Sequence, residues 1–117
     1  MQRSVRPSEI KGSIKAPASK SMMQRSVAAA LLSDGFTILH NPSFCDDSMA
    51  ALDIARRLGA VIEIKKDEVL IKGGFAPNED HVNCRESGLC MRMFAPIASL
   101  HNSEITINGS DCPAIAP

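Results

Sequence analysis

The sequence predicts one mixed α/β domain, of the α/β or α+β class, and three observations lead to this prediction. The 117 residues fit a single domain of ordinary size. Apolar residues make up 44% of the chain, enough to bury a modest core. Segments with helical periodicity alternate with short segments typical of strands. The expected order is strand, helix, strand, helix, strand, strand, followed by strand, helix, strand.

The first expected pair is a strand over residues 11–17 and a helix that follows it. Ile14 gives the strand a weak alternation, and Pro17 ends it. An apolar stripe and three consecutive alanines predict the helix over residues 19–34. Ser19 or Ser21 can cap its start, and Gly35 stands where a C-terminal cap is expected.

The next pair is a strand over residues 36–43 and the clearest helix of the chain, over residues 45–60. The Asn41-Pro42 pair is typical of a turn and is expected to end the strand. Asp46 or Asp47 is expected to cap the helix, and Gly59 follows its last turn. A hairpin is then expected from two apolar runs that flank the sequence KKDE.

The last elements are a short strand over residues 81–87, a helix over 88–100 and a strand over 103–110. The helix is apolar on nearly every side, which predicts a buried helix that Pro96 kinks or breaks. The order of elements suggests one unit over about residues 10–74 and a partial second copy over about 80–117.

Charge and composition limit the classes of partner and site. Thirteen basic residues balance thirteen acidic residues, so neither nucleic acid nor an anionic membrane is expected as a partner. No apolar run approaches the roughly 18 residues that span a bilayer. The cysteines lack metal-binding spacing, so no metal is expected, and they indicate reduced thiols in a cytoplasmic protein: Cys45, Cys84, Cys90 and Cys112.

The stretch KAPASKSMMQR contains a candidate anion site. Lys20 and two serines stand where the first helix begins, and Arg25 returns to the face of Ser21 one turn later. Unpaired backbone N–H groups, an ammonium, hydroxyls and a guanidinium could converge there on one anion. The alternative is an ordinary helix cap with a solvated lysine. No glycine pair precedes Lys20, which excludes a P-loop.

A second candidate site lies at the start of the last helix. Gly88 would let a ligand approach the backbone closely. Arg92 follows one turn later among apolar neighbours. It is either a binding residue near this helix start or an arginine at the helix edge that reaches water.

Several stretches together resemble 5-enolpyruvylshikimate-3-phosphate synthase. The family opens with an extended strand, then P-[GA]-S-K-S-x-x-x-R and a helix rich in Ala and Leu, and residues 17–25 fit every position. DDSMAALDIARRLGA resembles the next helix, ESGLCMRMFAPIASL resembles the N-[AS]-G-T-x-x-R helix, and ITINGSDCPAIAP stands where the family has a loop ending in Arg-Pro. Order and spacing match along nearly the whole chain, which would be an amino-terminal fragment of less than half a family member.

The resemblance implies a fold and a reaction. The fold is the inside-out α/β barrel, built from β-α-β-α-β-β units, of which this chain would hold part of the first domain. The reaction transfers the enolpyruvyl group of phosphoenolpyruvate to the 5-hydroxyl of shikimate 3-phosphate, without cofactor or metal. By this resemblance Ser21 and Arg25 hold shikimate 3-phosphate, Lys20 touches both substrates, and Gly88 lies against phosphoenolpyruvate.

The sequence departs from the family pattern at three positions. Glu86 and Leu89 replace the Asn and Thr around the glycine, and Ala116 stands where the loop has its arginine. The family's proton-transfer residues have no counterpart here, so no catalytic residue is expected and the chain should not turn over alone. Uncovered strand edges also predict self-association.

Two alternatives remain. A UDP-N-acetylglucosamine enolpyruvyl transferase has S-G-A-K-N at the opening motif, which Ser21 and Arg25 argue against. A non-catalytic anion-binding domain made of repeat units would bind without transferring any group.

Overall fold

Two small sheets and three helices form the body of the protein. The computed structural model describes residues 1–109. The chain runs in order through α1 (Lys20–Leu32), β1 (Phe36–His40), α2 (Asp46–Arg57), β2 (Val61–Ile64), β3 (Glu68–Lys72), β4 (His81–Asn83), α3 (Gly88–Ala98) and β5 (Thr106–Asn108). The order of helices and strands from residue 20 onward confirms the prediction.

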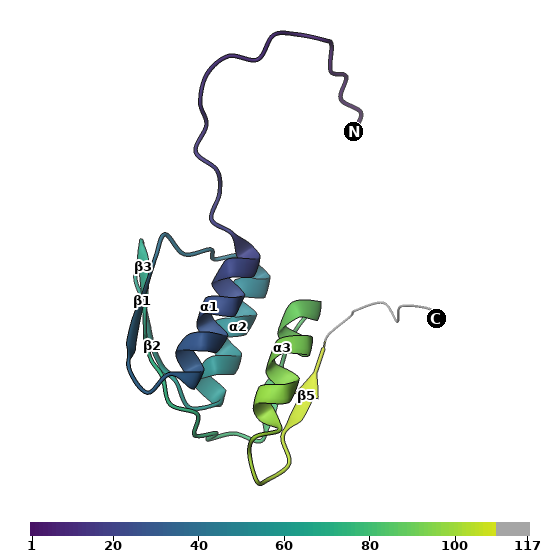
Figure 1. Cartoon of the computed structure of the whole chain (residues 1–117). Helices are drawn as coiled ribbons and strands as arrows, with labels where there is room; N and C mark the ends of the chain where they lie inside the picture. Colours follow the sequence, from purple (N-terminus) through teal and green to yellow (C-terminus); the bar gives the residue numbers. More distant parts are fainter. Residues whose placement is uncertain (110–117) are drawn as a thin grey trace.

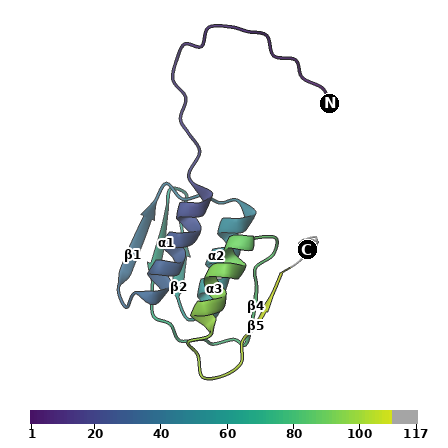
Figure 2. The same ribbon diagram turned by 45° about the vertical axis from the view of Figure 1, so that its right-hand side comes forward.

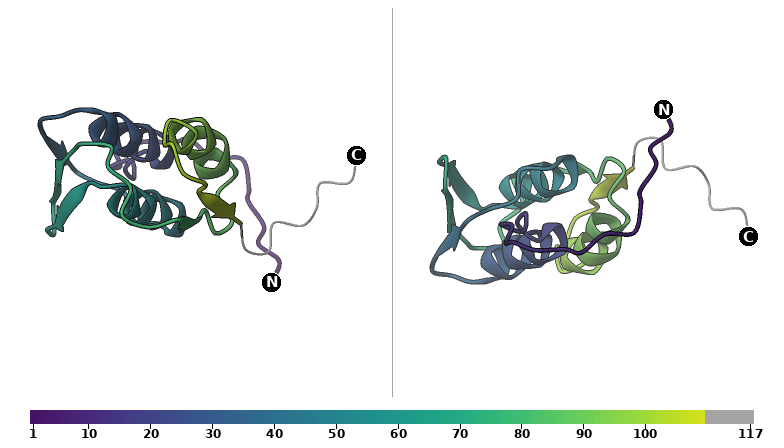
Figure 3. Two further views of the ribbon diagram at one scale, coloured as in Figure 1. Left: turned by 90° about the horizontal axis from the view of Figure 1, so that it is seen from below. Right: turned by 90° about the horizontal axis from the view of Figure 1, so that it is seen from above.

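The first sheet is antiparallel, with β3 between β1 and β2. Ile71 of β3 lies opposite Thr37 on one side and Ile62 on the other. The expected hairpin is therefore present as β2 and β3. Figure 3 shows α1 and α2 on one side of this sheet. Val69 and Ile71 of β3 are fully buried in the core that these helices share.

The second sheet is the parallel pair β4 and β5, joined through α3. A parallel pair needs a long crossover connection, and here α3 supplies it. Val82 of β4 is fully buried, and its partner Ile107 is half-buried against the same core. This β-α-β segment packs beside the first unit.

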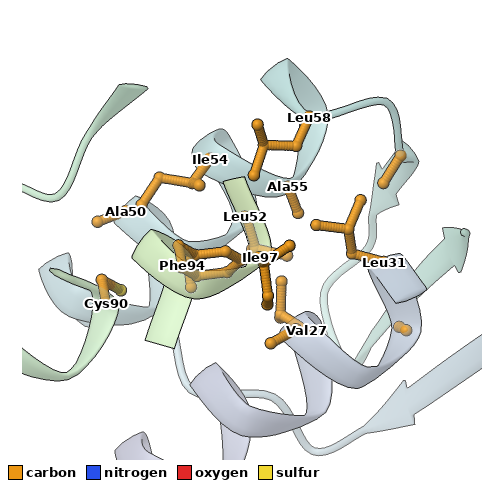
Figure 4. Close-up of a cluster of buried hydrophobic side chains, with 14 of the residues drawn as sticks. Val27, Leu31, Ala50, Leu52, Ile54, Ala55, Leu58, Cys90, Phe94 and Ile97 are labelled. Carbon is orange, nitrogen blue, oxygen red and sulfur yellow. The ribbon is translucent and has the colours of Figure 1, made fainter. Parts of the chain in front are cut away.

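One apolar core joins the three helices. Phe94 of α3 is fully buried and lies among side chains of the other two helices, with Val27 of α1 and Leu52 of α2 beside it in Figure 4. The burial of a phenylalanine ring is among the largest apolar contributions that one side chain can make.

The three helices begin at the same end of the molecule, and this arrangement positions the candidate site. In Figures 1 and 2 each helix runs downward from its first residue. Contacts near the helix starts agree, because Lys20 of α1 pairs with Asp47 of α2 and the Ser87 N-cap of α3 donates to Gln24 of α1. Three positive ends of helix dipoles therefore lie close together.

Two glycines allow close packing at the opposite end. The Cβ that any other residue carries at position 73 would lie 1.9 Å from the Ser33 carbonyl oxygen and 2.0 Å from that of Ala30. At Gly59, φ is +118° and a Cβ would lie 2.6 Å from the Ala76 nitrogen. Gly59 directly follows Leu58, the C-cap of α2, as its sequence position suggests.

The expected strand over residues 11–17 is wrong for this structure. Residues 1–19 form no helix or strand, and Figure 1 shows them extending away from the body. Ile14 is 96% exposed, so the segment has no apolar surface to pack against. Alternation alone does not form a strand when no partner strand lies alongside within residues 1–109.

The helix ends also differ from expectation. Ser19 is the N-cap of α1, as one of the two alternatives proposed, but Ser33 rather than Gly35 is its C-cap. The N-cap of α2 is Cys45, whose side chain makes no capping bond; neither Asp46 nor Asp47 caps the helix, since both lie in its first turn.

The expected burial and break of α3 are also corrected. The helix continues two residues past Pro96 and ends at Ala98, so the proline does not break it. In its last turn, the Pro96 carbonyl accepts a hydrogen bond from the Ser99 hydroxyl at 2.6 Å. Only one side of α3 is buried, and Arg92, Ala95 and Pro96 are exposed.

Within residues 1–109, no helix is both long and apolar enough to cross a bilayer.

Candidate functional site

The start of α1 offers backbone donors without a competing carboxylate on its own first turn. The Ser19 hydroxyl accepts from the Met22 N–H at 3.3 Å, and the Ser19 carbonyl accepts from the Met23 N–H at 3.0 Å. The N–H groups of Lys20 and Ser21 precede the first intrahelical bond, so they remain available to a ligand. No acidic residue lies in this first turn. This helix start therefore suits an anion.

Lys20 is held by an acidic partner from the next helix. Its ammonium lies 2.8 Å from a carboxylate oxygen of Asp47. The hydrogen bond with Asp47, followed by the charge attraction between the two groups, raises the pKa of Lys20 above its ordinary value. Lys20 is therefore fully protonated near neutral pH. An incoming anion would meet an ammonium that already has a counter-ion.

Ser21 and Arg25 lie on one face of α1, as their four-residue spacing predicts. Ser21 is half-buried, whereas Arg25 is exposed. Lys20 is turned toward α2, about 100° from Ser21 around the helix axis. Ser21 and Arg25 therefore share one face of α1, whereas Lys20 is directed toward Asp47 of α2.

The cavity beside α1 does not contain this trio. It has a volume of about 250 Å³ and lies between α1 and β1, where Ser19, Met22 and His40 are among its lining residues. Lys20, Ser21 and Arg25 do not line it. The expected convergence of all three side chains on one enclosed pocket is therefore not seen in this cavity.

The start of α3 forms a second cavity, and it contains both remaining candidates. The cavity has a volume of about 180 Å³ and is lined by Arg85, Glu86, Ser87, Gly88, Met91, Arg92 and Gly109. A Cβ built on Gly88 meets no atom within 4 Å, so open space lies in front of this backbone. The exposed Arg92 lies on the side of α3 that borders the same cavity.

Glu86 is the group in this cavity that opposes an anion. It also borders a wider depression of about 450 Å³ with Asp46, Asp47 and Arg85 at the starts of α2 and α3. The negative charge of Glu86 would repel an anionic ligand in this cavity. Arg85 lines both cavities and supplies a positive charge next to Glu86.

A buried amide connects the two helix starts. Gln24 is fully buried, and its Oε1 atom accepts from the Ser87 hydroxyl at 2.8 Å and from the Cys90 thiol at 3.3 Å. Its Nε2 atom donates to the Lys20 carbonyl at 3.4 Å. The sequence interpretation missed Gln24. A polar residue four positions after Lys20, within the apolar stripe of α1, was the available signal.

Asp47 is the second residue whose role was missed. It was interpreted as a helix cap, but its carboxylate pairs with Lys20 across helices. Contacts between separate helices carry no signal in a single sequence. Among residues 1–109, no group of three or more His, Cys, Asp and Glu side chains is arranged to hold a metal ion.

Comparison with known proteins places this chain. The family model described as EPSP synthase (3-phosphoshikimate 1-carboxyvinyltransferase) matches residues 5–113. The chain belongs to the EPSP synthase family. The match covers both helix starts, from the Ser-Lys-Ser stretch to the segment around Gly88.

Individual EPSP synthase relatives agree with this assignment. A 3-phosphoshikimate 1-carboxyvinyltransferase from Clostridium perfringens is 33% identical over 108 residues, which cover 90% of this chain and 26% of that protein. One from Methanobrevibacter smithii is 37% identical, covering 89% of this chain and 25% of that protein. The chain spans about a quarter of the length of these curated relatives.

A solved structure shares the fold. The EPSP synthase from Acinetobacter baumannii matches with a TM-score of 0.77 and 26% identity over 91% of this chain and 25% of that one. The mixed α/β fold is therefore that of the corresponding part of an EPSP synthase. Ala116, which replaces the arginine of the Arg-Pro loop, and Cys112 lie outside the described residues.

Proposed function

We propose that this chain supplies part of the substrate site of an EPSP synthase. The reaction transfers the enolpyruvyl group from phosphoenolpyruvate to the 5-hydroxyl of shikimate 3-phosphate and releases phosphate. One observation carries the proposal: two helix starts that bear the matching residues, and whose first turns contain no acid, lie at one end of the molecule and are bonded to each other.

The proposed roles follow from the charges at this end. Ser21 and Arg25 hold the phosphate of shikimate 3-phosphate, because a guanidinium can bond two of its oxygens at once. Lys20 lies beside them and contacts both substrates. Gly88 lies against phosphoenolpyruvate, with Arg92 at the edge of the same cavity. Fixed cations offset the mutual repulsion of two anions and hold them in contact.

In this proposal the ion pair between Lys20 and Asp47 prepares the lysine for a substrate. An anionic substrate competes with Asp47 for the ammonium of Lys20, since the two charges attract the same cation. The pair therefore keeps Lys20 protonated and close to the helix start before a substrate arrives.

The barrel architecture is also proposed rather than observed. In this proposal residues 10–74 form one unit of an inside-out α/β barrel and residues 80–117 begin a second. Parallel helices that share one core, with a sheet on their outer side, support it. The chain alone would not turn over, because the family's proton-transfer residues have no counterpart in its 117 residues.

We also propose self-association through the first sheet. β1 and β2 are its outer strands, and each presents an edge with no partner strand among residues 1–109. Phe36 and Val61 on these strands are 79% and 69% exposed. Unpaired edges with apolar side chains favour pairing between copies. A monomer in light scattering at high concentration would contradict this proposal.

Calorimetric titration of the purified chain with shikimate 3-phosphate tests the proposed function. We expect saturable binding that Arg25→Ala abolishes and that Arg56→Ala preserves, since Arg56 is an exposed helical arginine near the end of α2. Binding without phosphate release, when phosphoenolpyruvate is added, is the expected result for the chain alone. No binding at all would leave a structural repeat domain as the better description.

A further inference from the structure

We propose that Gln24 is a positioning residue that fixes the start of α1 relative to the start of α3. Its consequence for ligand binding rests on the proposed function, whereas the mechanical link itself does not. The opening motif leaves position 24 unspecified, and neither the family match nor the resemblance assigns it a role.

The polar contacts at the helix starts form a closed triangle. Gln24 joins α1 to α3 through the Ser87 hydroxyl. The Cys90 thiol lies near two acceptors, Gln24 Oε1 at 3.3 Å and the Asp47 carbonyl at 3.7 Å, and shares its single proton between them, which joins α3 to both other helices. Lys20 joins α1 to α2 through the Asp47 carboxylate. Each of the three helix starts is thus fixed to both others.

The hydrogen bonds that link Gln24 to α3 and to Lys20 are mutually compatible, because each donor has its own proton to give. The Cys90 N–H donates to the Ser87 hydroxyl at 3.1 Å, which leaves the Ser87 proton free for Gln24 Oε1. Gln24 Nε2 then donates to the carbonyl of Lys20. Burial raises the pKa of the Cys90 thiol, so this group remains a donor near neutral pH.

The buried amide of Gln24 is better explained by a role in positioning the helix starts than by a contribution to the stability of the fold. Gln24 lies among apolar core residues of α1, where an apolar side chain of similar size would avoid the cost of burying an amide. A buried polar network restricts the packing to arrangements that satisfy every member. The arrangement that satisfies this one places Ser87, the N-cap next to Gly88, one hydrogen bond from α1.

The link is tested first without any ligand. In the ¹⁵N-labelled chain, Ser87→Ala should shift the amide resonances of Lys20 and Ser21, and Ser87→Thr, which keeps the hydroxyl, should shift them much less. In a Gln24→Met background the effect of Ser87→Ala on those two amides should disappear. Unmoved amides in the Ser87→Ala chain, or equal shifts in both backgrounds, would overturn the proposal. The comparison of the Ala and Thr variants decides the matter even if Gln24→Met does not fold.

The consequence for binding is tested by titration of the same variants with shikimate 3-phosphate. Gln24→Met should weaken binding by roughly tenfold, the equivalent of one lost hydrogen-bond link. Val27→Ala is the matched control, because it removes buried volume from the same helix outside the network. It should lower the unfolding midpoint and leave the dissociation constant of the folded chain unchanged.

The two tests separate the outcomes. Amide coupling through Gln24 without any binding by the parent chain would support the link and refute the proposed function. Binding that Gln24→Met leaves unchanged would overturn the positioning role, and so would an equal loss of affinity in Val27→Ala.

Discussion

The ammonium of Lys20 lies 2.8 Å from the carboxylate of Asp47, and this ion pair joins the first turns of α1 and α2. The Asp47 carboxylate therefore forms an ion pair with a lysine of another helix and does not cap the backbone of its own helix. The lysine of the Ser-Lys-Ser stretch is held in place and remains charged.

Replacing the acidic partner should lower the pKa of Lys20. In Asp47→Asn the hydrogen bond to a charged partner and the charge attraction are both lost, so the pKa should fall toward the ordinary value of 10.5. Because the folded-state pKa is raised, the contribution of the pair to stability is complete below pH 10.5 and is lost as the pH rises through the folded value. NMR titration of the Lys20 side chain measures the shift. Asp46→Asn is the matched control, and an equal change in that variant would contradict the assignment.

Cys45 should be the first thiol to react among the three in the described part of the chain. Burial acts to raise the pKa of Cys45, but hydrogen bonds from the Ser43 and Ser48 hydroxyls and from the backbone of Ser48 and Asp47 together outweigh it, so the pKa lies below its ordinary value. Burial, followed by the nearby charge of Cys90, raises the pKa of Cys84 to about 11. Brief treatment with iodoacetamide near pH 7, followed by peptide mass spectrometry, should show modification at Cys45 before Cys84 or Cys90.

A Ser48 variant tests whether a neighbouring hydroxyl lowers the pKa of Cys45. Ser48→Ala removes one hydrogen-bond partner of the Cys45 sulfur, which lies 3.3 Å from the Ser48 hydroxyl. The alkylation rate at Cys45 near pH 7 should fall in this variant. Labelling of Cys84 or Cys90 ahead of Cys45 in the native chain would show that this account of thiol reactivity is wrong.

Gly73→Ala should destabilise the fold strongly. The new methyl group would overlap the Ser33 and Ala30 carbonyl oxygens, both of which are backbone atoms of the α1 terminus that cannot rotate away. Overpacking of this kind costs about 1–3 kcal/mol, or more when backbone must shift. Urea unfolding followed by circular dichroism measures the loss. At Gly35 a Cβ would meet only the Ser33 hydroxyl at 3.6 Å, so Gly35→Ala should change little, and equal losses would contradict this explanation.

The sequence predicted the local elements well because their signals are local. The stripe of α1, the Ser19 cap and the hairpin of β2 and β3 each depend on residues within a few positions of one another. The expected strand over residues 11–17 is absent because a strand needs a partner, and none pairs with it among residues 1–109. Pro96 lies close to the end of α3, where the loss of one hydrogen bond is tolerated.

The candidate site was predictable in part. The motif located Ser21 and Arg25 on one face of α1 and Gly88 at the first residue of α3. The partner of Lys20 and the link from Gln24 to Ser87 join residues 27 and 63 positions apart, and they depend on how helices pack. No pattern within one helix specifies such contacts.

Mapping the ligand onto the chain tests the central claim most directly. The ¹⁵N-labelled protein would be titrated with shikimate 3-phosphate, with sulfate at matched ionic strength as the control for unspecific anion effects. The account predicts saturable amide shifts concentrated at residues 19–25 and 86–92, the starts of α1 and α3. Shifts that sulfate reproduces in full, that concentrate elsewhere, or that never saturate would contradict it.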